Sequence, residues 1–283
     1  MEHTEETSNL ALSPHSMEKG DQAGKTRNEK VLNCLYKKPE AIFKLICFPW
    51  AGGGSTHFAK WGQDTQDLLE VHAIRLPGRE SRTGEPLVTD IYQIIDEITC
   101  AMLPVIQGKP FALFGHSMGA YIAFKTALHL KEKHKLEPLH LFLSSAFSPQ
   151  AKAQIQILID KALSDEQICH YLADFGGTPM NFLEDKELRQ QYMPIMMADV
   201  NIVSRCISES PSKTILSCDL TCFRGSEDID IAKDTEGWKD VTTGSINIHE
   251  LPGDHFYFKN PANEKFIKNY ITKCLEVSSL VDF

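Results

Sequence analysis

One serine in this chain has a glycine two positions away on either side, a spacing suited to nucleophilic chemistry. The segment Gly115-His116-Ser117-Met118-Gly119 follows an apolar run at 111–114 and precedes a stretch of helical character at 120–129. Between a strand and a helix, Gly-x-Ser-x-Gly forms a tight turn that exposes the serine hydroxyl, because larger side chains at the glycines would clash. The serine itself takes a strained backbone conformation. Ser117 is therefore the predicted nucleophile.

A serine hydroxyl becomes a good nucleophile only when a neighbouring base takes its proton. In proteins with this turn, the catalytic residues follow the chain order serine, acid, histidine. Residues 251–258 read LPGDHFYF and place His255 after a strand-like run and a Pro-Gly turn, where a loop side chain can reach the serine. His255 is the predicted base. His57 precedes the serine and His116 lies inside the turn, so a structural role is expected for both.

The acid is expected in the loop after the strand-like run at 216–223, where it can accept the imidazole N–H and hold the productive tautomer. That loop, 224–228, reads RGSED. Asp228 is the first aspartate after the turn and is the predicted acid. Three neighbouring acidic residues remain alternatives: Glu227, Asp230 and Asp234.

Acyl transfer to a serine also needs N–H donors directed at the oxyanion that develops. One donor is expected from the backbone of Met118 and the other from the loop at 48–54, which reads FPWAGGG. The glycines there allow the main chain to approach a substrate closely, so the second donor is predicted to be Trp50 or Ala51. Neither a Rossmann nor a Walker pattern is formed by these glycines.

The elements that must position these residues alternate between strand-like and helical patterns. Strand-like runs lie at 44–49, 71–76, 111–114, 139–143, 216–223 and 246–251, and helical patterns lie at 57–69, 91–98 and 120–129. Repeated units of this kind form a mostly parallel, doubly wound sheet with helices on both faces. With the Gly-x-Ser-x-Gly turn, they predict the α/β class and the α/β-hydrolase fold.

Two segments depart from this alternation. Residues 1–30 are polar and are expected to form a disordered extension, which leaves 31–283 as a single domain. The stretch from about 148 to 205 is helical in pattern and is expected to be a lid inserted between two strands. It contains apolar side chains that could line an acyl channel or fill a small helical core: Phe175, Met180, Phe182, Met193, Met196 and Met197.

The composition excludes several classes of function. A net charge of −9 with interspersed Lys and Glu argues against nucleic-acid binding, and no apolar run is long enough for membrane insertion. The eight cysteines are scattered, there is no secretory leader pattern and no Asn-x-Ser/Thr sequon, so reduced thiols in the cytosol are expected. Cys218 and Cys222 lack further ligands nearby, and no metal site is expected.

Five motifs in order resemble the type II thioesterases, from about Arg27 to the C-terminus: FPWAGG at 48–53, LPGRE at 76–80, GHSMG at 115–119, GGTP at 176–179 and PGDHF at 252–256. The resemblance implies a serine enzyme without metal or cofactor, in which Ser117, Asp228 and His255 match the catalytic triad. There are two departures. The extension before about Met17 is longer than usual, and residues 228–231, which read DIDI, keep Asp230 open as the acid.

The same resemblance implies the substrate and the partner. The family releases fatty-acyl chains from the acyl carrier protein of fatty acid or polyketide and peptide synthases, and we expect the chain to act as a monomer. Because both proteins are acidic, docking would need a local basic patch, for which Arg75, Arg79 and Arg82 are the candidates. Two rival functions are a carboxylesterase or lipase with the same triad and a catalytically silent binding protein.

Overall fold

The computed structural model describes residues 28–149, 167, 185–208 and 215–281. Residues 1–27 of the predicted disordered extension lie outside these ranges, as do the GGTP motif at 176–179, Phe175, Met180 and Phe182. Residues 28–30, also predicted to be disordered, form with residue 31 one turn of helix that leads into the sheet. No helix in the described ranges is both long and apolar enough to cross a bilayer.

The centre of the fold is a seven-stranded sheet in the order β1-β3-β2-β4-β5-β6-β7. The strands are β1 (Leu32–Asn33), β2 (Phe43–Phe48), β3 (Leu69–Ile74), β4 (Phe111–His116), β5 (His140–Ser144), β6 (Asp219–Gly225) and β7 (Ile246–Leu251). All neighbouring strands are parallel except β1, which pairs antiparallel with β3. β2 to β5 are buried on both faces, and β2, β4 and β5 are accordingly mostly apolar, whereas β3 alternates and includes the buried Glu70 and His72. The predicted mostly parallel sheet is confirmed.

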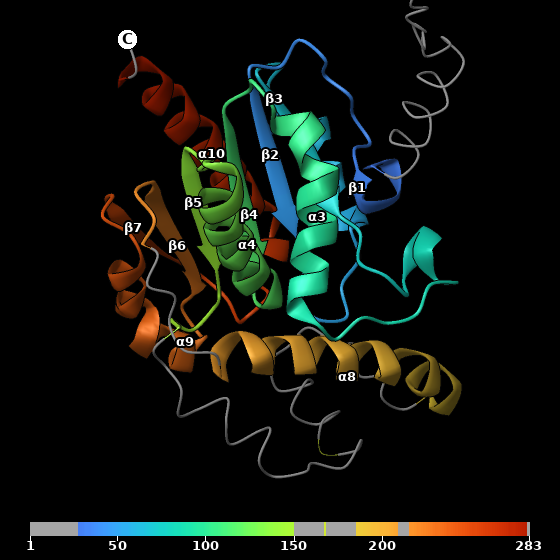
Figure 1. The fold of residues 1–283 in the computed structure, drawn as a ribbon. Helices are drawn as coiled ribbons and strands as arrows, with labels where there is room; N and C mark the ends of the chain where they lie inside the picture. The colour runs from blue at the N-terminus through green and yellow to red at the C-terminus, as the bar shows by residue number, and fades with distance from the viewer. Residues whose placement is uncertain (1–27, 150–166, 168–184, 209–214, 282–283) are drawn as a thin grey trace, which may run out of the picture.

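Helices cover both faces of the sheet (Figure 1). The longer ones are α3 (Ile91–Ile106), α4 (Met118–His129), α8 (Lys186–Ser208) and α10 (Pro261–Val281); the short ones are α2 (Thr56–Ala59) and α9 (Ile229–Asp234). α3 and α4 pack into one core cluster, and α2 and α10 pack into a second cluster on the other face. The sheet is therefore doubly wound, as predicted.

Two predicted elements differ in extent from the structure, and two observed elements were not predicted. The expected helix at 57–69 ends as a 3₁₀ turn at Lys60–Gln63, because Leu69 already belongs to β3. The expected strand at 216–223 begins only at Asp219, while Leu216 forms an isolated bridge with Thr242. Neither the two-residue β1 nor α10 was indicated by the patterns considered.

The order of strands determines where a site can form. The chain passes from β2 to β3 on one side and then returns to β4 on the other side of β2. In open parallel sheets, ligands bind where the carboxyl ends of two such strands diverge. The loop after β2 and the turn after β4 meet at this point, and α8 crosses the carboxyl ends of the strands (Figure 1). α8 makes up most of the described part of the segment predicted as a lid, and it is helical, as the sequence pattern indicated.

Candidate active site

Ser117 lies in the sharp turn between β4 and α4. Its backbone angles are φ 54° and ψ −118°, a region that non-glycine residues rarely adopt. Its N–H donates to the Ser144 carbonyl at 2.8 Å on the neighbouring strand, which fixes the turn against the sheet. A Cβ at Gly115 would lie 2.2 Å from the Gly119 carbonyl oxygen, and one at Gly119 would lie 2.1 Å from that of Phe48. Both glycines are therefore required by close backbone approach, as the sequence predicts.

His255 and Asp228 come from the loops that follow β7 and β6. His255 Nδ1 lies 2.8 Å from Asp228 Oδ2, and both side chains are buried. The loops are fastened together because Glu227 N donates to the Gly253 carbonyl at 2.9 Å, and a Cβ at Gly225 would lie 2.2 Å from the Asp254 carbonyl oxygen. This arrangement matches the histidine–acid half of a catalytic triad.

The two alternative histidines occupy structural positions. His116 is fully buried and its Nδ1 lies 2.8 Å from Ser144 Oγ, while burial holds its pKa well below the usual range. Its ring centroid lies 5.0 Å from that of His255, so it packs behind the predicted base. His57 packs edge-on against Trp50 and Phe58, and burial lowers its pKa as well. Both rings are thus packed among neighbouring side chains, as expected for structural residues.

The alternative acids either have other partners in the structure or are exposed. Asp230 is exposed and accepts from Lys233 Nζ at 3.1 Å. Asp234 accepts from the Ser148 N–H at 2.5 Å, and Glu227 is exposed on the loop. The short repeat at 228–231 therefore places only its first aspartate next to the histidine.

The loop after β2 forms a tight turn beside Ser117. Gly53 N donates to the Trp50 carbonyl at 2.9 Å and Gly52 has φ +74°, which is typical of a type II turn. The N–H groups of Gly52 and Gly53 are engaged within the protein, the first with Asp199 Oδ2 at 2.7 Å. Across the described residues, the N–H groups of Trp50 and Ala51 have no hydrogen-bond partner. Met118 is the first residue of α4, where N–H groups lack intrahelical acceptors.

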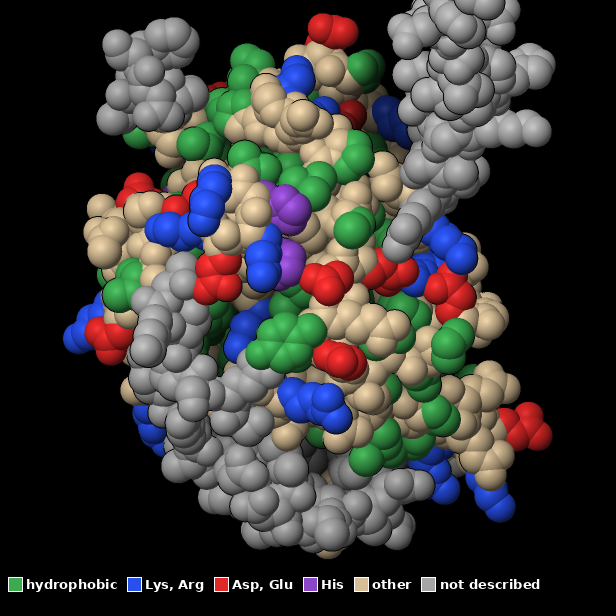
Figure 2. Space-filling model, in the orientation of Figure 1, with side chains coloured by type: hydrophobic (Ala, Val, Ile, Leu, Met, Phe, Trp, Pro, Cys, Tyr) green, Lys and Arg blue, Asp and Glu red, His purple; other side chains and the backbone are tan. Residues whose placement is uncertain are grey.

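The predicted basic docking patch is wrong, because the structure buries two of its three arginines. Arg79 is 7% exposed and forms an ion pair with Asp199, and Arg82 is 2% exposed and pairs with Glu97. Arg75 donates to backbone carbonyls and to Glu80. On the face shown in Figure 2, basic and acidic side chains are interspersed and form no single basic area.

Sequence reasoning missed two residues that hold the loop after β2. Glu80 accepts hydrogen bonds from the N–H and hydroxyl groups of Ser55 and Thr56, which keeps its pKa below the usual value despite burial. Asp199, in the middle of α8, is fully buried. The LPGRE pattern could have indicated Glu80, whereas nothing in the local sequence distinguishes Asp199 from a solvated helical aspartate.

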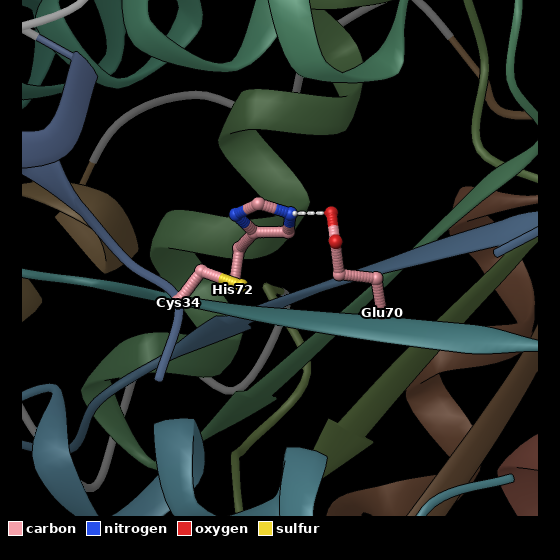
Figure 3. Close-up of side chains that lie close together, drawn as sticks. All are labelled: Cys34, Glu70 and His72. Atoms are coloured by element: carbon pink, nitrogen blue, oxygen red, sulfur yellow. Dashed lines mark hydrogen bonds and ion pairs between the residues drawn. The ribbon is translucent and has the colours of Figure 1, made fainter. Parts of the chain in front are cut away.

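Three neighbouring side chains are of types that can bind metals, but the carboxylate among them is already paired with a lysine. Cys34, Glu70 and His72 lie close together at the β1–β3 edge (Figure 3), and His72 Nε2 lies 2.7 Å from Glu70 Oε1. The same oxygen accepts from Lys44 Nζ at 2.7 Å, so a divalent cation there would face an ammonium group. Burial and Glu70 raise the pKa of the Cys34 thiol to about 11, which disfavours the thiolate that a metal requires.

Cys218 and Cys222 are both buried as free thiols, and burial raises the pKa of each. For Cys218 it rises to about 12. The pair therefore belongs to the core around β6, and the described cysteines are all unbridged.

Comparison with known proteins identifies the family. Residues 43–274 match the thioesterase domain. The chain is 67% identical to human S-acyl fatty acid synthase thioesterase, medium chain, over 94% of this chain and 100% of the relative. It is 34% identical to the gramicidin S biosynthesis protein GrsT of Aneurinibacillus migulanus, over 77% and 83% of the two chains.

Solved structures agree with this result. The crystal structure of human thioesterase 2 has 61% identity and a TM-score of 0.67, covering 84% of this chain and 98% of that one. The RedJ thioesterase of Streptomyces coelicolor has 28% identity and a TM-score of 0.75, covering 84% and 92%. These neighbours confirm the predicted α/β-hydrolase architecture. The chain belongs to the thioesterase family.

Proposed function

We propose that this protein hydrolyses medium- to long-chain fatty-acyl thioesters held on the acyl carrier protein of fatty acid synthase, and so releases free fatty acids of set length. The observation that carries the proposal is the buried hydrogen bond between His255 and Asp228, next to a serine in a strained turn, in a thioesterase chain. The 67% identity to a medium-chain fatty acid synthase thioesterase supports the substrate class.

In this mechanism Ser117 attacks the thioester carbonyl while His255 takes the hydroxyl proton. Asp228 holds the imidazole in the tautomer that leaves Nε2 as acceptor and stabilises the imidazolium that forms. The oxyanion is held by the N–H of Met118 together with that of Trp50 or Ala51. Because a thiol has a pKa of about 8.5, the thiolate leaves with little help from a proton donor. His255 then activates water to hydrolyse the acyl-serine.

We further infer that residues 31–283 act as one domain, with the segment at about 148–205 covering the acyl site. α8 supports this assignment because Tyr192 and Met196 lie against Gly52, in the loop next to Ser117. We also infer that the protein acts as a monomer in the cytosol, where its unbridged cysteines would stay reduced.

The rival function is hydrolysis of oxygen esters by the same three residues. Turnover of a decanoyl thioester and the matching decanoyl oxygen ester separates the two, with Ser117→Ala as the control for both. We expect the thioester to be cleaved faster, and Ser117→Ala to retain less than about a hundredth of wild-type activity with an unchanged circular dichroism spectrum. Preference for the oxygen ester would indicate an esterase. Turnover of neither would indicate a binding protein.

A further inference from the structure

A buried carboxylate on α8 is bonded to the loop that approaches Ser117. Asp199 is 0% exposed, and its two oxygens accept from Arg79 Nη1 and Nη2 at 2.7 Å each. Oδ2 also accepts from the Gly52 N–H at 2.7 Å. The same guanidinium donates from Nη1 to the Gly53 carbonyl at 3.1 Å. The ion pair thus contacts two peptides of one short loop, Ala51–Gly52 through Asp199 and Gly53–Gly54 through Arg79.

Stability alone gives a weak reason for such a pair. Transfer of two charges from water into the interior carries a desolvation penalty that their attraction often fails to exceed. Apolar side chains of similar volume would fill the space as well. What an apolar pair could not do is accept the Gly52 N–H, so the distinctive effect of Asp199 is on the orientation of that peptide.

The orientation of the Gly52 N–H is the feature that separates two kinds of turn. In a type II turn the peptide between the two central residues, here Ala51 and Gly52, is rotated by about 180° from its direction in a type I turn. Asp199 accepts from the N–H of that peptide and so selects the type II form seen here. With the Gly52 N–H bonded to α8, the N–H groups of Trp50 and Ala51 are the ones in this turn without an acceptor among the described residues.

Other side chains of α8 fit the same glycine. A Cβ at Gly52 would lie 1.8 Å from Tyr192 Oη and 2.3 Å from Met196 Sδ. Burial and the charge of Asp199 raise the pKa of Tyr192 to about 12, so its hydroxyl stays protonated beside the loop. Tyr192, Met196 and Asp199, which lie on successive turns of α8, therefore all lie against Gly52.

We propose that Asp199 is a positioning residue for catalysis, which holds the oxyanion-binding turn at 50–53 through the Gly52 N–H and Arg79 and so couples that turn to the position of α8. The proposal rests on the proposed function, because it assigns part of the oxyanion site to that turn. Misplacement of a donor by about 1 Å is enough to lower turnover by about 100-fold.

The chain offers a matched control for this ion pair. Arg82 is also buried and also donates two hydrogen bonds to one carboxylate, from Nη2 to Glu97 Oε1 at 2.7 Å and from Nη1 to Oε2 at 3.1 Å, although it keeps a second partner in Glu85. Glu97 lies on α3 and makes no contact with the loop at 50–53 in the described residues. Loss of the Glu97 carboxylate weakens the pairing of a second buried arginine in the same region without changing the turn.

The test compares Asp199→Leu, the double variant Asp199→Leu/Arg79→Met and the control Glu97→Gln on a decanoyl thioester. Leucine cannot accept the Gly52 N–H, so for Asp199→Leu we expect kcat to fall about 100-fold with KM within about twofold, and binding of a decanoyl trifluoromethyl ketone to weaken in step with kcat/KM. The ketone forms a tetrahedral oxyanion on serine and so reports on the donors. Glu97→Gln is expected to lower the melting temperature while keeping kcat within about twofold.

The double variant separates positioning from simple stability, because it removes both charges and leaves no buried charge uncompensated. We expect it to melt near the wild-type temperature but to retain the low kcat and weak ketone binding. Recovery of wild-type kcat in this stable variant would overturn the proposal. If the wild type failed to cleave any thioester, the proposed function would fail first. Hydrogen exchange at the amide of Gly52 would then decide whether Asp199 holds the turn: protection lost in the double variant supports it, and unchanged protection overturns it.

Discussion

His255 Nδ1 and Asp228 Oδ2 lie 2.8 Å apart, with both side chains buried between the loops after β7 and β6. A carboxylate in this place fixes the proton on Nδ1 and leaves Nε2 free of it, so that the ring can accept the proton of Ser117. Asp230, two residues further on, is exposed and pairs with Lys233. The two aspartates therefore differ in what they can do for the histidine.

The first prediction follows from this difference. Asp228→Asn is expected to lower kcat by about 10³- to 10⁴-fold, because an amide favours the wrong imidazole tautomer and cannot stabilise the imidazolium. Asp230→Asn removes only an exposed ion pair and is expected to keep kcat within about twofold. Steady-state hydrolysis of a decanoyl thioester measures both, and the reverse ranking would transfer the role of acid to Asp230.

The second prediction concerns the close approach of α4 to the end of β2. In Gly119→Ala the new Cβ would lie 2.1 Å from the Phe48 carbonyl oxygen and 2.7 Å from that of Pro49, both backbone atoms that cannot rotate away. We expect a loss of about 3 kcal/mol in the free energy of unfolding by urea, together with lower activity, because the oxyanion loop begins at Pro49. Gly84→Ala, where no atom lies within 4 Å, is the control and should stay within about 0.5 kcal/mol. Equal stability of the two variants would contradict the assigned contact.

The residues of the candidate triad were predictable because each belongs to a local pattern. Ser117 lies in a turn that five residues define, and the chain order of this fold limited where the histidine and the acid could be. The apolar runs of β2, β4 and β5 were equally clear, because strands buried on both faces carry few polar residues.

The Asp199–Arg79 pair was not predictable in the same way. Its two residues are 120 positions apart, and the helix around Asp199 carries no local signal of a buried charge. Arg79 was assigned to a docking surface because sequence shows charge but not burial. A buried charge is recognised only from its partner, and that partner depends on the tertiary position of α8.

The third prediction is a dependence of stability on pH that arises from His140. The ring is buried on β5, stacks on Phe142 at 4.2 Å and contacts Thr221 Oγ1 through Nε2 at 2.8 Å. Burial lowers its pKa from 6.5 to about 4. Between about pH 6.5 and pH 4, His140 is therefore protonated in the unfolded chain but neutral in the folded protein. The free energy of unfolding consequently decreases as the pH falls through this window.

For His140 this linkage amounts to about 2 kcal/mol between pH 7.5 and pH 5. His140→Leu removes the titrating group. We expect the variant to be less stable than wild type at pH 7.5, because the Thr221 hydroxyl loses one of its partners, but to lose less stability on acidification. Urea unfolding at the two pH values measures the difference. If the stability of the variant falls as steeply as that of wild type, His140 does not contribute to the loss of stability at acidic pH.

The last prediction concerns the methionines of α8. Met193 and Met196 are buried and Met197 is half-buried, and Met196 reaches Gly52 in the loop beside Ser117. If these thioethers line an acyl channel, only substrates long enough to pass beyond the triad will contact them. Replacing all three with Ser is therefore expected to raise KM several-fold for a ten-carbon or longer thioester and to change cleavage of an acetyl or butyryl thioester little. Each lost methylene contact is worth under about 1 kcal/mol, so the total effect stays modest.

The control for this variant is Ile202→Ser, on the same helix. Ile202 is 1% exposed and belongs to the core cluster that α8 shares with α4. Its replacement is expected to lower the melting temperature and to leave the ratio of KM values for long and short substrates unchanged, because a cavity in that core does not adjoin the acyl chain. Should the methionine variant behave like Ile202→Ser, with lower stability and the same loss on short and long substrates, the three methionines would be ordinary core. A chain-length effect in the methionine variant alone would place the acyl chain against α8, next to the loop that Asp199 holds.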